Sequence, residues 1–158
     1  MISGLIETWH IHNRIHLYLL DAVPADALHS RTPASNRSIA GIFAHIHSVR
    51  LQWIEPNEAD LMTTLSKIPA RSQSQIEAIT PDIIRQALTA SGDAMALMLE
   101  RRLKKGKVSG FKPHASAFFA YIIAHDSHHR GEIGIILSAL GHRLPKEIDH
   151  GLWNWAER

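Results

Sequence analysis

Cysteine is absent from the 158-residue sequence, and this absence alone excludes several kinds of chemistry. Disulfides, iron–sulfur clusters, thiolate zinc sites and a cysteine nucleophile are all ruled out, so the fold must rest on packing. No segment approaches the roughly 18 apolar residues of a membrane span, and we expect no signal peptide at the N-terminus. A formal net charge of only +2 is too small to indicate a nucleic-acid partner. We therefore expect a cytoplasmic protein that binds neither membranes nor nucleic acid.

Length and composition are ordinary, with one exception. The length fits a single domain over residues 1–158, and a chain of this size buries roughly 70% of its unfolded surface. An apolar fraction of 45% and a charged fraction of 20% are typical of soluble globular proteins. The exception is histidine, which occurs 12 times. Because histidine is the commonest metal ligand and titrates near neutral pH, these residues are the first candidates for chemistry.

Four segments show the hydrophobic periodicity of amphipathic helices. They run at about residues 2–20, 39–55, 81–105 and 115–140. No window alternates with period two for long enough to indicate a strand. The link between the second and third segments is long, although Leu61, Met62 and Leu65 predict a short helix within it. A long link favours a crossover, so we predict an all-α four-helix bundle with this crossover between helices 2 and 3.

Signals for helix ends support these boundaries. Ser38 or Asn36 can cap the second helix, and Pro56 is expected to end it because proline disfavours helix in the preceding residue. Thr80 can cap the third helix, with Pro81 at the first helical position, where its missing N–H costs nothing.

The fourth segment carries two histidines, His125 and His129, at a spacing that places both on one helix face. They continue an apolar stripe, so both imidazoles should point inward. A buried polar group without a partner costs roughly 1–3 kcal/mol, and a metal ion bound at about 2.0–2.1 Å would satisfy both rings. The alternative is two core histidines that each bond a backbone carbonyl. His128 should lie nearer the edge of the helix.

A third ligand must come from another helix. The second helix offers His45 and His47, which flank its apolar face on opposite sides, and periodicity does not choose between them. The first helix offers His12, Asn13 and His16. Since Asn13 and His16 continue the apolar stripe of that helix, we expect them either to orient a metal ligand through a hydrogen bond or to be satisfied core residues.

The order of three sequence motifs resembles the DinB/YfiT-like family. The run Ser38-Ile-Ala-Gly-Ile-Phe-Ala-His45 is similar to the second-helix motif of that family. The run from Ala124 to Ile133, which contains a histidine, three residues and then His-Arg-Gly, is similar to its fourth-helix motif. Trp9, followed by Asn-Arg and Leu-Asp-Ala-Val-Pro, and a tryptophan-bearing tail complete a resemblance that covers nearly the whole chain.

The resemblance implies a four-helix bundle of unusual connectivity, often a homodimer, with three metal-ligating histidines. Carried over by position, these are His45, His125 and His129, and His45 is selected over His47. The implied ion is zinc or nickel, and family members include thiol S-transferases and a thiol-dependent isomerase. Three histidines leave one coordination position open to water, the pattern of a catalytic site.

Two functions follow from this interpretation. The first is a metal-dependent enzyme, a thiol S-transferase or hydrolase, acting on a small molecule, with a low-molecular-weight thiol as cosubstrate in the transferase case. The second is a non-catalytic, metal-stabilised bundle that acts as a dimeric binding module, which a fourth ligand such as His12, His16 or His47 would support.

Two charged residues directly follow the histidines of the fourth segment. Asp126 points about 100° away from His125 on a helix, so we expect it to be an exposed acidic residue or a hydrogen-bond partner of a neighbour. Arg130 is expected to form a structural ion pair with Glu132, Asp126 or a partner subunit.

Overall fold

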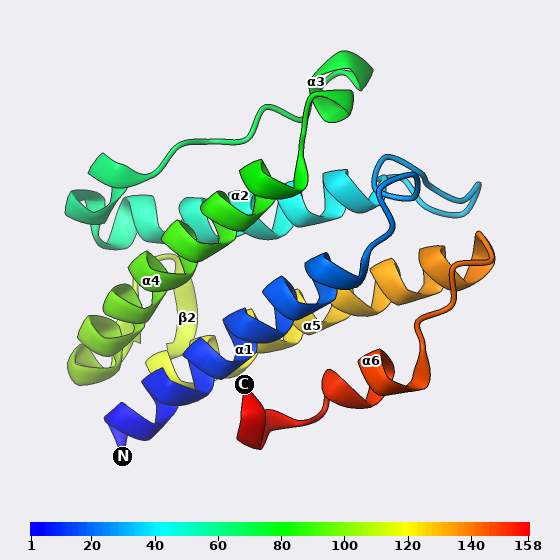
Figure 1. The fold of residues 1–158 in the computed structure, drawn as a ribbon. Coiled ribbons are helices and arrows are strands. Elements are labelled where there is room, and N and C mark those ends of the chain that lie inside the picture. The colour runs from blue at the N-terminus through cyan, green and yellow to red at the C-terminus, as the bar shows by residue number, and fades with distance from the viewer.

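The computed structural model describes all residues from 1 to 158 and is predominantly helical (Figure 1). Its long helices are α1 (Ile2–Ala22), α2 (Ile39–Asn57), α4 (Pro81–Lys105) and α5 (Ala115–Ala139). The shorter elements are the 3-10 segments η1 (Ala59–Thr64) and η2 (Trp155–Glu157), the helices α3 (Gln73–Glu77) and α6 (Lys146–Gly151), and the strands β1 (Lys107–Val108) and β2 (Phe111–His114). The all-α prediction is therefore confirmed.

Side-chain caps define where two of the long helices begin. The Ser38 hydroxyl accepts a hydrogen bond from the Gly41 N–H at 3.1 Å, so Ser38, not Asn36, caps α2. Thr80 caps α4 in the same way, through the Ile83 N–H at 3.3 Å, with Pro81 at the first helical position. Each cap satisfies one of the N–H groups that a helix start leaves without a partner.

Two details differ from the sequence-based expectation. Helix α2 continues through Pro56 to Asn57. Pro56 lies in the last turn, so the backbone hydrogen bond that its missing N–H removes is lost only at the end of the helix. After α4, residues 107–114 form an antiparallel hairpin in which Val108 pairs with Phe111. Strands of two and four residues are too short to produce a period-two pattern, so the sequence did not reveal them.

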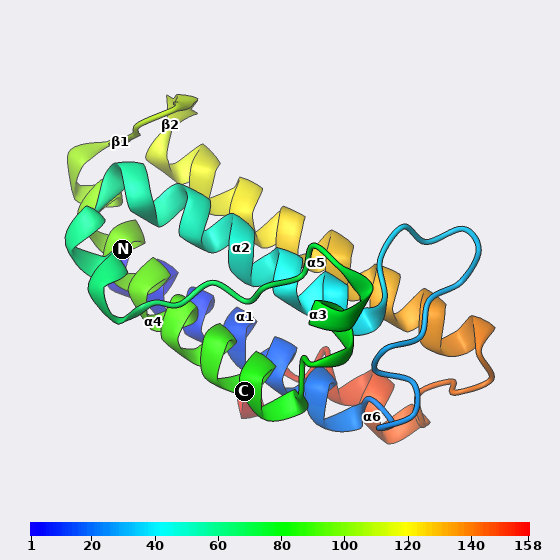
Figure 2. The same cartoon turned by 90° about the horizontal axis from the view of Figure 1, so that it is seen from above.

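The long helices contact one another in the cyclic order α1, α4, α2, α5, so α1 and α2 are not direct neighbours (Figures 1 and 2). The connection that contains η1 and α3 runs back along α2, and α4 therefore starts at the same end of the molecule as α2 (Figure 2). No helix combines the length and the apolar character that crossing a membrane requires.

A buried polar layer divides the hydrophobic core into two clusters. One cluster joins the second half of α1 to the first half of α2 and the second half of α5. The other joins Trp9 to the middle of α4 and the first half of α5. Fully or nearly fully buried polar side chains lie between them, namely His12, Asn13, His16, Arg50, Ser91 and Asp126. Such a layer is stable only when its polar groups are paired, so its hydrogen bonds matter to the whole fold.

Candidate metal centre

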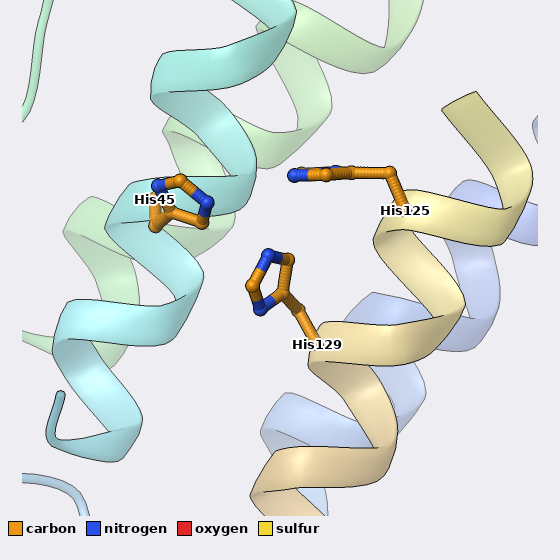
Figure 3. A group of neighbouring side chains, drawn as sticks. All are labelled: His45, His125 and His129. Carbon is orange, nitrogen blue, oxygen red and sulfur yellow. The ribbon is translucent and has the colours of Figure 1, made fainter. Parts of the chain in front are cut away.

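Three histidines from two helices point toward one another (Figure 3). His45 comes from α2, and His125 and His129 come from successive turns of α5. One ring nitrogen from each residue lies within 4.8 Å of the other two. Since zinc–nitrogen bonds are about 2.0–2.1 Å, nitrogens on one ion lie at most roughly 4 Å apart, and a slight closure of the rings would suffice. The structure thus brings together the three histidines that the sequence singled out.

The neighbouring histidines are directed elsewhere. His47 is buried, and its Nε2 lies 2.9 Å from the carbonyl oxygen of Ser66 in the connection after η1. The two positions that separate it from His45 turn its side chain about 200° around α2. The side chain of His128 is 69% exposed, as the periodicity of α5 predicts. Neither residue therefore belongs to the group of His45, His125 and His129.

Carboxylates orient both histidines of α5. The Nδ1 of His125 lies 3.0 Å from Asp126 Oδ1, and the Nδ1 of His129 lies 2.5 Å from Glu132 Oε2. When each Nδ1–H donates to its carboxylate, the Nε2 atom is left unprotonated with its lone pair free. Metal-binding histidines usually have such a carboxylate partner, which sets the tautomer and the ring orientation.

Asp126 is fully buried, so the favoured expectation of an exposed acidic residue was wrong, and the alternative of a hydrogen-bond partner for a neighbour is correct. Its Oδ2 accepts hydrogen bonds from Arg50 Nε at 3.1 Å and Arg50 Nη2 at 2.8 Å. Arg50 is itself fully buried and was missed by the sequence analysis. A signal existed, because Arg50 follows Ile46 by four residues and therefore continues the apolar face of α2. A buried arginine on that face requires an anionic partner from another helix.

Asn13 and His16 belong to the same buried network. Asn13 Oδ1 accepts a hydrogen bond from Arg50 Nη1 at 2.7 Å, and its Nδ2 donates to the Leu88 carbonyl at 3.2 Å. His16 Nε2 lies 3.2 Å from His12 Nε2 and 3.6 Å from Asp126 Oδ2. Asn13 is a satisfied core group, whereas the buried Nδ1 of His16 has no hydrogen-bond partner. Neither residue contacts the three histidines directly. His16 approaches His125 through Asp126, and Asn13 does so through Arg50 and then Asp126.

The close approach of α1 and α4 holds Asn13 in this network. A Cβ atom on Gly92 of α4 would lie 2.3 Å from Asn13 Nδ2, so only glycine leaves room for the amide. Next to it, Trp9 Nε1 donates a hydrogen bond to the Gly92 carbonyl at 2.8 Å. The close contact between α1 and α4 thus holds Asn13 in place within the polar layer.

Comparison of the sequence with models of known protein families shows to which family the chain belongs. The sequence model of the DinB family matches residues 2–156. The chain belongs to the DinB family. Searches of curated proteins and of solved structures gave no significant match. The resemblance to this family, which the sequence motifs indicated, is therefore confirmed over residues 2–156.

Two further groups in this DinB-family protein have metal-ligand atoms within 4.8 Å of one another. The first, His12, His16 and Asp126, lies in the buried polar layer, and its Asp126 oxygen is already bonded to the Arg50 guanidinium. The second combines the exposed His128 with His129 and Glu132. A guanidinium repels a divalent cation, and an exposed histidine is costly to hold in one place, so both groups are less suited to an ion than the three histidines.

Burial and charge favour the neutral forms of His45 and His129 in this DinB-family protein. Burial, and next the charge of Arg37, lowers the pKa of His45 to about 4. Burial also lowers the pKa of His129, although the hydrogen bond to Glu132 opposes that shift. Burial by itself raises the pKa of Asp126, but the Arg50 charge and the neighbouring histidines outweigh it and hold that pKa well below its usual range. The site therefore presents two neutral imidazoles, those of His45 and His129, near the ionised carboxylate of Asp126.

These shifts predict that the metal-free protein loses stability as the pH falls. Burial also lowers the pKa of His12, His16 and His47. From pH 6.5 toward about 4, the folded state resists protons that the unfolded state takes up, so unfolding becomes more favourable. Thermal unfolding of metal-free protein between about pH 5 and 8 should show the midpoint falling on the acid side.

A variant and a control test the origin of this pH dependence. His45→Gln should make the decline shallower, because one buried ring no longer titrates. His128→Gln, at an exposed position of α5, should leave the slope unchanged. A midpoint that stays constant or rises toward acid pH would contradict the prediction.

Arg130 forms no ion pair with Glu132 or Asp126 within the chain. Its guanidinium donates to Ser127 Oγ at 3.1 Å and lies 3.4 Å from His16 Nε2. The reason is geometric: Arg130 lies half a turn of α5 away from Glu132, whose carboxylate is turned to His129. Arg130 therefore joins the polar layer from α5 and does not face the three histidines.

Two cavities flank the three-histidine cluster. His45 lines a cavity of about 800 Å³ whose walls are the 29–38 loop, the first half of α2 and residues 67–76. His125 lines a smaller one of about 430 Å³ beside the aromatic rings of Trp53 and Tyr121. A small molecule in either cavity would reach one of the candidate ligands.

Proposed function

We propose that this protein is a metal-dependent enzyme that acts on a small molecule, with one divalent ion, zinc or nickel, held by His45, His125 and His129. The proposed reaction is thiol S-transfer, with a low-molecular-weight thiol as cosubstrate, or hydrolysis. The donor set suits such an ion, because neutral imidazoles bind zinc, nickel, copper or iron well. In this proposal the four long helices form the DinB-like bundle, and the connection between α2 and α4 is its crossover.

The single observation that carries the proposal is the absence of a fourth side-chain ligand. A structural site would be closed by another residue, such as His12, His16 or His47. His12 and His16 instead face each other and Asp126, and His47 faces the Ser66 carbonyl. Three histidines with a free fourth position are typical of catalytic ions, so the geometry supports the enzyme over the non-catalytic bundle.

The chain prepares the site for an ion in two ways. Asp126 and Glu132 each accept the Nδ1 proton of one histidine, so that the opposite ring nitrogen of His125 and of His129 is free to bind. Arg50 holds Asp126 ionised and in place through two hydrogen bonds. A bound divalent ion would supply Lewis acidity to a substrate oxygen or to a thiol sulfur.

The two cavities support small-molecule chemistry. Their volumes, about 800 and 430 Å³, fall within the range of about 300–1,000 Å³ that small-molecule pockets have. They reach the cluster through different histidines, His45 and His125, so each cavity could hold one of the two reactants of a transfer reaction. The homodimer is also a proposal, and it rests on the family resemblance alone.

Metal analysis and activity assays together test the proposal. Protein purified without a histidine tag should hold close to one equivalent of zinc or nickel by elemental analysis. Thiol-transfer and ester- or amide-hydrolysis assays should show a rate that a chelator abolishes and the same ion restores. Protein that binds no ion, even after incubation with both metals, would refute the metal site. Protein that binds one equivalent but is inactive in every assay would favour the non-catalytic bundle.

A further inference from the structure

The larger cavity, beside His45, is unusually polar and cationic. Only four of its seventeen lining residues are hydrophobic, whereas most ligand pockets are lined predominantly by apolar side chains. No aspartate or glutamate lines it, although the chain has 15 acidic residues against 17 basic ones. Four basic residues do, namely Arg31, Arg37, Lys67 and Arg71. A nearly neutral protein therefore concentrates positive charge at this one cavity.

None of these four cations has a carboxylate partner within the protein. The ion pairs of the chain engage other basic residues, namely Arg50, Arg85, Arg101, Arg102, Lys104 and Lys105. All four cavity cations are exposed. A cleft lined by charges of one sign concentrates the electric field and attracts ions of the opposite sign. The cavity is thus prepared for an anion that the protein itself does not provide.

The N-terminus of α2 adds to this positive potential. Ser38, the capping residue, and Gly41 both line the cavity. The start of a helix carries a partial positive charge, and α2 extends for 19 residues from this point. Arginine also offers paired N–H groups that match the two oxygens of a carboxylate or phosphate. Charge, dipole and donor geometry therefore favour the same class of ligand.

The cationic cavity adjoins the three histidines through His45. His45 and Arg37 both line this cavity. An anion held by Arg37 would therefore share the cavity with one of the candidate metal ligands. The rest of its molecule could extend from the cavity to the three histidines.

We propose that this cavity is a subsite for an oxyanion, either carboxylate or phosphate, carried by a small-molecule substrate that reacts at the three histidines. The claim that the substrate reacts at the three histidines rests on the proposed function, whereas the binding of the anion depends only on the cavity. At about 800 Å³ the cavity takes a small organic acid or phosphate ester. The substrate of this enzyme is thus an anion.

Isothermal titration calorimetry with charged and neutral probes tests this subsite. Glutarate and glycerol 3-phosphate are titrated into metal-free and zinc-loaded protein, with glutaramide and glycerol as their uncharged counterparts. At least one anion should bind both forms of the protein, and the neutral compounds should not. The anion that binds more tightly identifies the substrate as a carboxylic acid or a phosphate ester.

A matched pair of double variants locates the binding. Arg37→Gln/Arg71→Gln should weaken anion binding by roughly 100-fold, since each lost charged hydrogen bond is worth about tenfold or more. Lys112→Gln/Lys146→Gln removes the same charge from exposed positions outside the cavity and should leave binding unchanged.

Three outcomes would overturn the subsite. The first is no anion binding to either form of the protein. The second is equal weakening by both double variants, which would indicate general charge attraction. The third is binding to zinc-loaded protein alone that Arg37→Gln/Arg71→Gln does not affect, which would place the anion on the ion. Only the subsite fails in the third case, and metal analysis of the same samples reports on the proposed function separately.

Discussion

Replacing His125 and His129 together by alanine is expected to abolish binding of the divalent ion. The two residues make up two of the three proposed ligands, both on one face of α5, so only His45 of this group would remain. The loss of affinity should exceed the roughly 10–100-fold that removal of an outer-shell partner costs. Elemental analysis after dialysis, together with zinc titration of the metal-free protein, measures this loss directly.

His128→Ala is the matched control for that variant. His128 lies on the same turn of α5 as His129, but its side chain is 69% exposed. Removing it should leave both the metal content and the affinity unchanged. If the double variant kept one equivalent of metal, the ion would lie elsewhere, and the buried group of His12, His16 and Asp126 would become the leading candidate.

Arg50→Met is expected to lower the free energy of unfolding by about 3–5 kcal/mol. The substitution leaves the Asp126 carboxylate fully buried without the cation that donates two hydrogen bonds to it. It also removes the donor to Asn13 Oδ1. Urea unfolding of the metal-free protein, followed by circular dichroism, measures the change. Because Asp126 orients His125, metal affinity should also fall by roughly 10–100-fold.

Arg85→Met provides the comparison for a surface ion pair. Arg85 pairs with Asp21, and both side chains are largely exposed, so its loss should cost only about 0–1 kcal/mol. Asp126→Asn added to Arg50→Met removes the uncompensated charge and should recover part of the lost stability. A cost for Arg50→Met no greater than that for Arg85→Met would show that the buried pair does not hold the core together.

Local sequence signals determined the helices and two of the three histidines of the candidate metal centre. Thr80-Pro81 and Ser38 mark helix starts through hydrogen bonds that span three residues, which a sequence pattern captures. The spacing of His125 and His129 places both rings on one face because a helix repeats every 3.6 residues. The second-helix motif, through the family resemblance, selected His45, which spacing alone did not separate from His47.

Only the tertiary structure decided which polar residues surround those histidines. Arg50 and Asp126 are 76 positions apart, and their pairing depends on how α2 packs against α5. The position of Asp126 on α5, taken alone, predicts exposure to solvent. The guanidinium of Arg50 from α2 offsets the free-energy cost of burying the Asp126 carboxylate. The cationic cavity is likewise assembled from the 29–38 loop and residues 67–76. Irregular connections have no periodicity, so their shape and the charges they bring together follow from packing, not from local sequence.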